Sequence, residues 1–120
     1  MSNENTRQIP LNTRQVKKIL FVVMPYEGEV MDRVTPKFYK NSAVKYMPLG
    51  VLSIAACVPD KYQVEVLDSA SLGLSLDETI ERIETIAPDV LGLSVLTYRA
   101  WAMIQVLERT TASIKVVGGP

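Results

Sequence analysis

The chain has 120 residues, of which 48% are hydrophobic, and 13 basic side chains balance 13 acidic ones to a formal net charge of zero. This composition is typical of one globular domain that needs neither disulfides nor metal to fold, and its neutrality excludes the basic surface that nucleic acids and anionic membranes bind. No apolar run approaches the ~18 residues of a membrane-spanning helix, so we expect a cytoplasmic protein.

Cys57 is the single cysteine, and the chain contains no histidine. One thiol cannot form an internal disulfide, which fits a reducing cytoplasm. Without histidine the chain lacks the usual general base and the commonest transition-metal ligand, and one thiolate cannot hold zinc or an iron–sulfur cluster. We therefore expect no catalytic residue and no metal ligand here, so that any chemistry comes from a cofactor or another domain.

The amino-terminal part predicts a tail, a strand and a long loop. Residues 1–16 are polar without a hydrophobic period, which indicates a disordered tail before a domain over 17–120. Residues 19–23 are a continuous apolar run of strand length. Residues 24–45 hold two prolines, a glycine and mixed charges but no apolar stripe, so we expect a loop that is mobile without ligand.

Pro48 suits the first position of a helix, where a missing N–H costs nothing. The helix that follows is apolar nearly all round until Pro59 and Asp60 end it, and Cys57 within it is expected to be a buried, inert thiol. Residues 63–68 alternate and carry charge, which predicts a strand nearer the sheet edge.

Three further elements follow. Ser75 and Glu78 have the spacing of a capping box, which predicts the start of a helix. The outward face of this helix carries Glu81, Arg82 and Glu84. Its apolar stripe comprises Leu76, Ile80, Ile83 and Ala87. Residues 90–96 predict a strand buried on both faces. The next helix has its stripe at Ala100, Met103, Ile104 and Leu107, and residues 114–117 predict the fourth strand.

This alternation predicts an α/β, flavodoxin-like (Rossmann-like) doubly wound parallel sheet with right-handed crossovers. The uncharged runs 19–23 and 90–95 are expected to be central neighbours, with the charged strand 63–68 outside the first, which gives the order 2-1-3-4. A fifth strand would be missing, so we expect residues 114–117 to be an exposed edge prone to pairing. In such sheets the ligand crevice lies at the carboxyl ends of the first and third strands.

Several ligands are disfavoured at that crevice. The chain has neither G-x-G-x-x-G nor G-x-x-x-x-G-K-[ST], which removes the main support for a dinucleotide or P-loop site. Asp68 is better explained as a turn carboxylate than as a ribose ligand. A phosphoacceptor or flavin site is also unsupported, because Met24, Pro25 and Tyr26 follow the first strand. What remains is a lining of small residues and hydroxyls from Ser94, Thr97, Gly118 and Gly119.

The glycine pair at 118–119 supports two interpretations. Without Cβ atoms the backbone can approach a bulky ligand closely, or the pair can simply make a strand-to-helix turn. Under the first interpretation, a bulky residue at Gly119 would fill ligand space and abolish binding while leaving the fold intact. Ser94 and Thr97 have a structural interpretation too, as a strand hydroxyl and a helix cap.

Four segments together resemble a family. Residues 46–56 (YMPLGVLSIAA) resemble the P-L-G-x-x-x-[IL]-A-[AS] helix start of the cobalamin-binding domain in radical S-adenosylmethionine enzymes, and residues 66–68 (VLD), 87–94 (APDVLGLS) and 116–120 (VVGGP) follow in the same order. The resemblance covers roughly 17–120. It implies a cobalamin tail inserted between sheet and helices; the implied cofactor-binding residues are Tyr26, Pro48, Leu49, Gly50, Ser94, Leu96, Thr97, Gly118 and Gly119.

The chain also departs from that family. The D-x-H-x-x-G motif, whose histidine ligates cobalt, is absent, which fits the radical-enzyme branch and base-off cobalamin without a histidine ligand. The C-x-x-x-C-x-x-C cluster motif is absent too, so the iron–sulfur cluster and S-adenosylmethionine would belong to a carboxyl-terminal domain of the parent enzyme. Two alternatives stay open: a degenerate domain without cofactor that positions substrate or a partner, and a small independent enzyme using Glu27 and Glu29.

Overall fold

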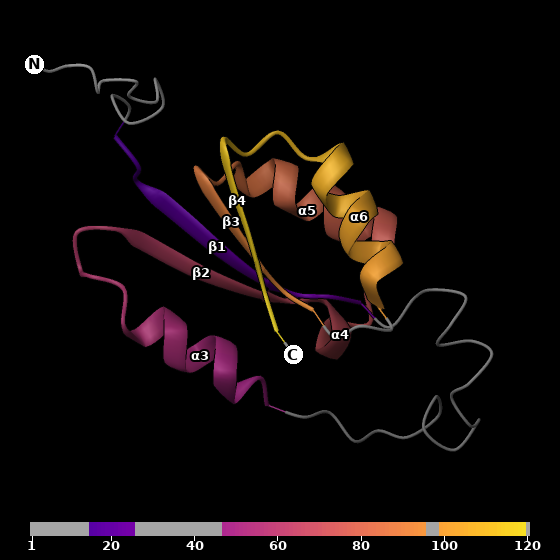
Figure 1. The fold of residues 1–120 in the computed structure, drawn as a ribbon, viewed down its shortest axis with the longest axis horizontal. Coiled ribbons are helices and arrows are strands. Elements are labelled where there is room, and N and C mark those ends of the chain that lie inside the picture. Colours follow the sequence, from indigo (N-terminus) through magenta and orange to yellow (C-terminus); the bar gives the residue numbers. More distant parts are fainter. Residues whose placement is uncertain (1–14, 26–46, 96–98, 120) are drawn as a thin grey trace, which may run out of the picture.

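The computed structural model describes residues 15–25, 47–95 and 99–119. Within them, four parallel strands form one sheet in the order β2-β1-β3-β4 (Figure 1). The strands are β1 (Lys18–Val23), β2 (Gln63–Asp68), β3 (Val90–Ser94) and β4 (Ile114–Gly118). β1 pairs with β2 on one side and β3 on the other, and β4 pairs with β3. The α/β class, the flavodoxin-like order and the central pair 19–23 with 90–95 are confirmed.

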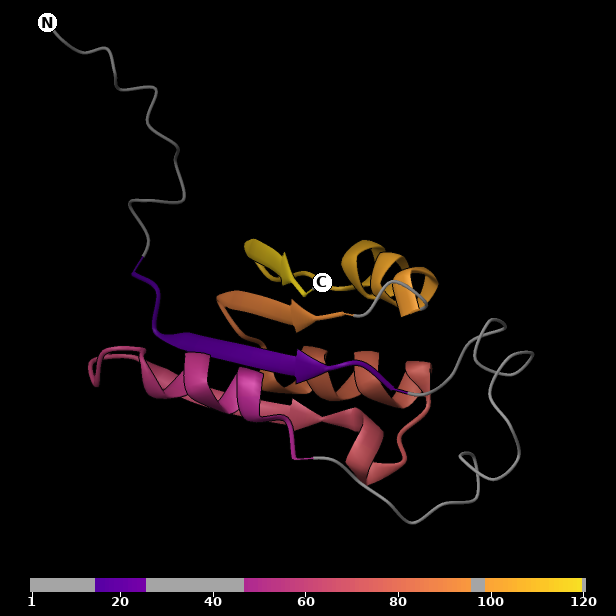
Figure 2. The ribbon, with the colours of Figure 1, turned by 60° about the horizontal axis from the view of Figure 1, so that its bottom comes forward.

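The helices lie on both faces of the sheet. α3 (Leu49–Ala56) contacts β2 and β1 on one face, while α5 (Leu76–Ile86) and α6 (Ala100–Arg109) cover the other (Figures 1 and 2). This division follows from right-handed crossovers, because the connection from β1 to β2 runs in the opposite direction across the sheet from the later two. A short helix, α4 (Ser69–Leu72), lies between β2 and α5 and was not predicted.

The core lies between the sheet and the two helices α5 and α6. Alternate residues of β1 and β3 point into it, because successive side chains of a strand face opposite ways. The buried hydrophobic members of this cluster are Leu20, Val22, Met24, Leu67, Leu76, Ile80, Ile83, Leu91, Leu93, Val95, Ala102 and Val106. Met24 and Pro25 were predicted to belong to a mobile loop, but both are buried; the rest of that loop, like the tail 1–14, lies outside the described residues.

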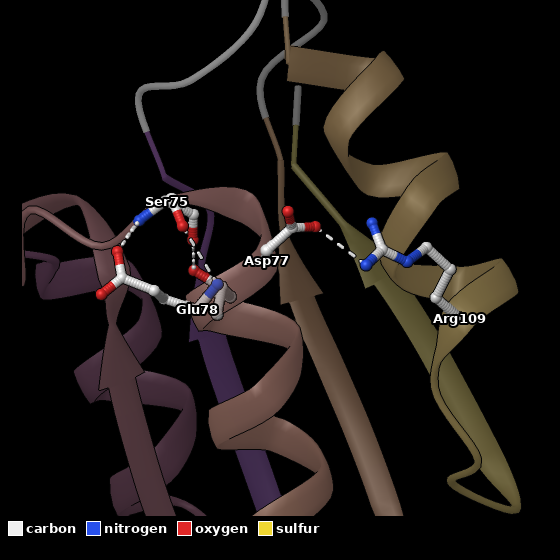
Figure 3. A network of polar contacts seen from close by, with 5 residues as sticks. Ser75, Asp77, Glu78 and Arg109 are labelled. Atoms are coloured by element: carbon white, nitrogen blue, oxygen red, sulfur yellow. Dashed lines mark hydrogen bonds and ion pairs between the residues drawn. The ribbon is translucent and has the colours of Figure 1, made fainter.

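Residues at the start of α5 form the expected capping box (Figure 3). The Ser75 hydroxyl accepts from the Glu78 N–H at 3.1 Å, and the Glu78 carboxylate accepts from the Ser75 N–H at 3.0 Å, which lowers the pKa of Glu78. In the same turn Asp77 accepts from Arg109 at 2.8 Å, an exposed ion pair that joins α5 to the end of α6. Exposed pairs contribute little, so the cap is the main determinant of where α5 begins.

The ends and faces of the helices differ in part from the sequence prediction. Pro48 is the N-cap of α3 instead of its first residue, and α3 ends at Ala56. Ala87 is the left-handed C-cap of α5 with φ of 53°, not a member of its stripe, because a proline follows it and disfavours the helical conformation. On α6 the buried residues are Ala102 and Val106; of the predicted stripe, Met103 and Leu107 pack against the core and Ile104 is exposed.

Asp89 ties together the amino ends of three strands. Its carboxylate oxygen Oδ2 accepts from the N–H groups of Lys18 and Lys17, both at 2.9 Å. Its own N–H donates to the Lys18 carbonyl, and its carbonyl accepts from the Ile114 N–H. The bonds from Lys18 and then Lys17 lower the pKa of Asp89. Ionised Asp89 therefore holds β1 in place beside β3.

Replacing Asp89 with asparagine is expected to destabilise the fold by about 1 kcal/mol near neutral pH, because uncharged oxygens accept these bonds less strongly. Because the pKa of Asp89 is lower in the folded state, its ionised carboxylate stabilises the fold at pH values above its unfolded pKa of about 3.9. This stabilisation is lost as the pH falls through the pKa of the folded state. The variant should therefore lose part of the acid-side slope in urea unfolding between about pH 5 and pH 2. Asp60→Asn, the same change in the exposed turn before β2, is the control; equal slopes in both variants would contradict the prediction.

Candidate functional site

The last residues of the four strands form a row across the carboxyl edge of the sheet. Pairing places Asp68, Val23, Ser94 and Gly118 side by side in that order. All four belong to the face opposite the core, because their neighbours Leu67, Val22, Leu93 and Val117 alternate with them along the strands. α3 begins at this edge and lies on the same face (Figure 1). This is the end of the sheet at which doubly wound folds bind ligands.

Six of the nine predicted cofactor-binding residues are described, and all six lie at this edge. Ser94 and Gly118 are paired neighbours, Gly119 follows Gly118, and Pro48, Leu49 and Gly50 form the cap and first turn of α3. Ser94, Leu49, Gly50, Gly118 and Gly119 are exposed, while Pro48 is half-buried. Tyr26, Leu96 and Thr97 lie outside the described residues, as do Glu27 and Glu29 of the alternative small enzyme.

On the α3 side of the sheet, Phe21 of β1 together with Gly92, Ser94, Val116 and Gly118 of β3 and β4 forms what we call the open shelf. α3 contacts β1 and β2 on this face, and beside it Ser94, Val116 and Gly118 of β3 and β4 are exposed. The Phe21 ring leans across Gly92, where a Cβ atom would lie 2.7 Å from ring carbon Cδ1. Val116 is 53% exposed, and Ser94 is exposed at the end of β3. The prediction that this strand is buried on both faces was wrong at Ser94.

The two glycines at the end of β4 have different surroundings. A Cβ atom at Gly118 would meet nothing within 4 Å, so the space above it is open. A Cβ atom at Gly119 would lie 2.0 Å from the Val95 carbonyl oxygen, and Gly119 has φ of +138°. The prediction that Gly119 can be enlarged while the fold stays intact was therefore wrong: backbone, not free space, lies against it. Gly118 is the glycine that leaves room on the shelf.

The outer surface of α3 is apolar and exposed. Only Val51 of this helix is buried, while Leu49, Leu52 and Ile54 are exposed, as is Met47 before it. Cys57, the C-cap, is also exposed, so the prediction of a buried thiol was wrong. The reason is geometric: an eight-residue helix lying on a sheet covers one stripe of its surface, whatever the rest of its composition. The shelf thus has an apolar helix beside it.

Arg99 is a residue at this edge that the sequence analysis missed. It is 8% exposed and its Nη1 donates to the Met24 carbonyl at 2.7 Å, which joins the end of β1 to the start of α6. A positive charge at a helix N-terminus opposes the helix dipole. That conflict was visible in the sequence, since an arginine directly precedes the apolar helix that follows the third strand, and it could have marked the residue.

Asp68 acts as a local cap. Its side chain accepts from the Ser71 N–H at 3.0 Å and from the Ser71 hydroxyl at 2.7 Å, and it is the N-cap of α4. Both carboxylate oxygens are therefore engaged in the turn after β2, which confirms the interpretation of Asp68 as a turn carboxylate. Among the described residues, no group of three or more histidine, cysteine, aspartate or glutamate side chains could hold a metal ion.

No described helix is long and apolar enough to cross a membrane. No protein-family model matches the chain, and comparisons with curated proteins and with solved structures give no match either. The geometry of the carboxyl edge is therefore the basis on which a function can be proposed.

Proposed function

We propose that the chain is the cobalamin-binding module of a cytoplasmic radical S-adenosylmethionine enzyme, with the cofactor base-off and without a histidine ligand. The observation that carries the proposal is the open shelf, which combines exposed sheet surface, an exposed Ser94 and free space above Gly118 at the ligand-binding edge. A large, flat, mostly uncharged ligand needs space and apolar contact more than charge, and the shelf with its apolar helix offers both.

The residues of the shelf fit such a group in part. Gly118 and Ser94 would lie under the ligand, and Leu49 and Gly50 would border it from the first turn of α3. Gly119 does not fit a contact role, because the backbone of Val95 occupies the position of its missing side chain. When bound, cobalamin would supply methyl-transfer or related chemistry, for which the parent enzyme's iron–sulfur cluster and S-adenosylmethionine would be needed. This chain's own residues would hold the cofactor and exclude water from one side of it.

Replacing Gly118 with phenylalanine is expected to weaken hydroxocobalamin binding at least about tenfold, because an aromatic side chain would occupy the shelf. The fold should be unaffected, since nothing lies within 4 Å of the added Cβ atom. Titration followed by visible absorption and amide chemical shifts measures both. Gly118→Ala is the matched control and should bind like the parent chain.

Two results would count against the proposal. If Gly118→Phe binds as well as Gly118→Ala, the ligand does not lie on the shelf. If neither this chain nor a protein that also contains the radical domain binds hydroxocobalamin, the degenerate module without cofactor becomes the better explanation. In that case the shelf would serve to position a substrate or another domain.

A further inference from the structure

The outer edge of β4 is an unpaired strand edge among the described residues (Figure 2). The Ile114 N–H donates to the Asp89 carbonyl, and the Gly118 carbonyl accepts from the Val95 N–H. Because alternate residues of a strand direct their backbone groups to opposite sides, Val116 also faces β3. The backbone groups of Lys115 and Val117 therefore point outward, and two N–H and two C=O groups are presented together.

Apolar side chains flank this edge on both faces of the sheet. Val116, on the α3 side, is 53% exposed, and Val117, on the α6 side, is 44% exposed. In parallel sheets, strands that are covered on both faces carry apolar side chains on both faces. β4 carries such side chains, Val116 and Val117, although both are exposed. Such an edge is a template for pairing with another strand.

The usual protection of a strand edge is missing here. Edge strands often carry a lysine whose charge repels an approaching strand. β4 has one lysine, Lys115, but its Nζ donates to the Leu107 carbonyl at 2.7 Å and to the Thr110 carbonyl at 2.6 Å. Its charge is thereby placed against the carboxyl end of α6, where it favours the helix dipole. The zero net charge of the chain adds no repulsion between copies.

We propose that β4 pairs antiparallel with β4 of a second copy of this chain, so that two four-stranded sheets join around a twofold axis. The axis passes between Val116 and its counterpart, which face each other as a non-hydrogen-bonded pair. Lys115 of each copy then lies opposite Val117 of the other, and these residues exchange four interchain hydrogen bonds. A second copy fits because the edge is self-complementary: each copy offers the same two donors and two acceptors at the same spacing.

The dimer should be weak, with a dissociation constant on the order of 0.1 mM, because the contact is far smaller than a standard protein interface. Sedimentation velocity of the 120-residue chain from about 10 µM to about 1 mM measures it. Amide hydrogen exchange gives a residue-level test. The amides of Lys115 and Val117 should exchange more slowly as concentration rises, while the Val116 amide, already bonded within the sheet, should not respond.

The self-opposed position of Val116 allows a charge-exchange experiment. Val116→Lys and Val116→Glu should each raise the dissociation constant about tenfold, because each places like charges directly opposite. A one-to-one mixture of the two variants should associate within about threefold of the parent chain, because opposite charges then face each other. Ile54→Lys, the same kind of change at a 57% exposed site on α3, should leave association unchanged.

Each outcome decides the proposal. A chain that is monomeric at about 1 mM, with Lys115 and Val117 amides exchanging freely, would overturn it and leave the edge to a different polypeptide. Association that persists in both single variants, or a mixture that fails to associate, would show that β4 does not oppose itself. Loss of association in Ile54→Lys would place the contact on α3 instead of the edge.

Discussion

Replacing Gly119 with alanine is expected to destabilise the chain by about 2 kcal/mol, because φ of +138° is a conformation that residues with a Cβ atom adopt only at a cost of roughly 1 to 3 kcal/mol. The added methyl group would also lie 2.0 Å from the Val95 carbonyl oxygen, a distance that backbone atoms must open. We expect the end of β4 to lift from β3 and weaken the hydrogen bond from the Val95 N–H to the Gly118 carbonyl, which is 3.0 Å long.

The neighbouring glycine provides the matched control. Gly118→Ala introduces the same methyl group one residue earlier, where nothing lies within 4 Å and φ is not in the left-handed region. Its free energy of unfolding should stay within about 0.5 kcal/mol of the parent value. Urea unfolding measures both variants, and exchange of the Val95 amide locates the damage. Equal stability of the two variants would mean that Gly119 tolerates a side chain and that the local packing is looser than described.

Replacing Arg99 with methionine is expected to lower the free energy of unfolding by about 1 to 3 kcal/mol, the cost of leaving the buried Met24 carbonyl without its donor. Removing a positive charge from the N-terminus of α6 returns about 0.3 to 1 kcal/mol, so the loss of the hydrogen bond should dominate. Arg99→Lys should recover part of the stability, since a lysine keeps a donor for the carbonyl but loses the planar shape of the guanidinium.

Arg82→Met serves as the control for this prediction. Arg82 is exposed on α5, and its replacement should change stability by no more than about 0.5 kcal/mol. Hydrogen exchange should show the end of β1 opening in Arg99→Met and not in the control. If Arg99→Met is as stable as the parent chain, the bond to Met24 contributes nothing that water cannot replace.

The sequence determined the fold more completely than the site. Charge on residues 63–68 and its absence in 19–23 and 90–95 were enough to order the strands, because a charged strand is excluded from the centre of a parallel sheet. The spacing of Ser75 and Glu78 predicted the start of α5, because a capping box is formed by residues three apart in the chain. The helix cap depends on residues that are close in sequence, and the strand order depends on which strands are buried at the centre of the sheet. The local sequence indicates both.

The errors concern contacts between distant segments. The sequence does not distinguish Gly118 from Gly119, whereas in the structure Gly119 alone has a positive φ and lies against the backbone of Val95. Ile104 belongs to a good apolar stripe, yet it is exposed, while Ala102 and Val106 are buried with Met103 and Leu107 packed beside them. Arg99 was missed since its partner is a carbonyl 75 residues away. Helix periodicity and turn chemistry carry no information about such partners.

The place of β1 in the sheet has a consequence for how the chain acquires its structure. β1 comes first among the described strands, but the Asp89 carboxylate that accepts from the Lys18 and Lys17 amides lies 71 and 72 residues later, and β3 begins directly after it. β2 follows sooner, but the other side of this apolar central strand has no hydrogen-bonding partner until β3 has been synthesised. Pairings so distant in sequence slow folding. During this interval the run 19–23 is the segment most exposed to aggregation and to chaperone capture, and early folding of the amino-terminal half alone is disfavoured.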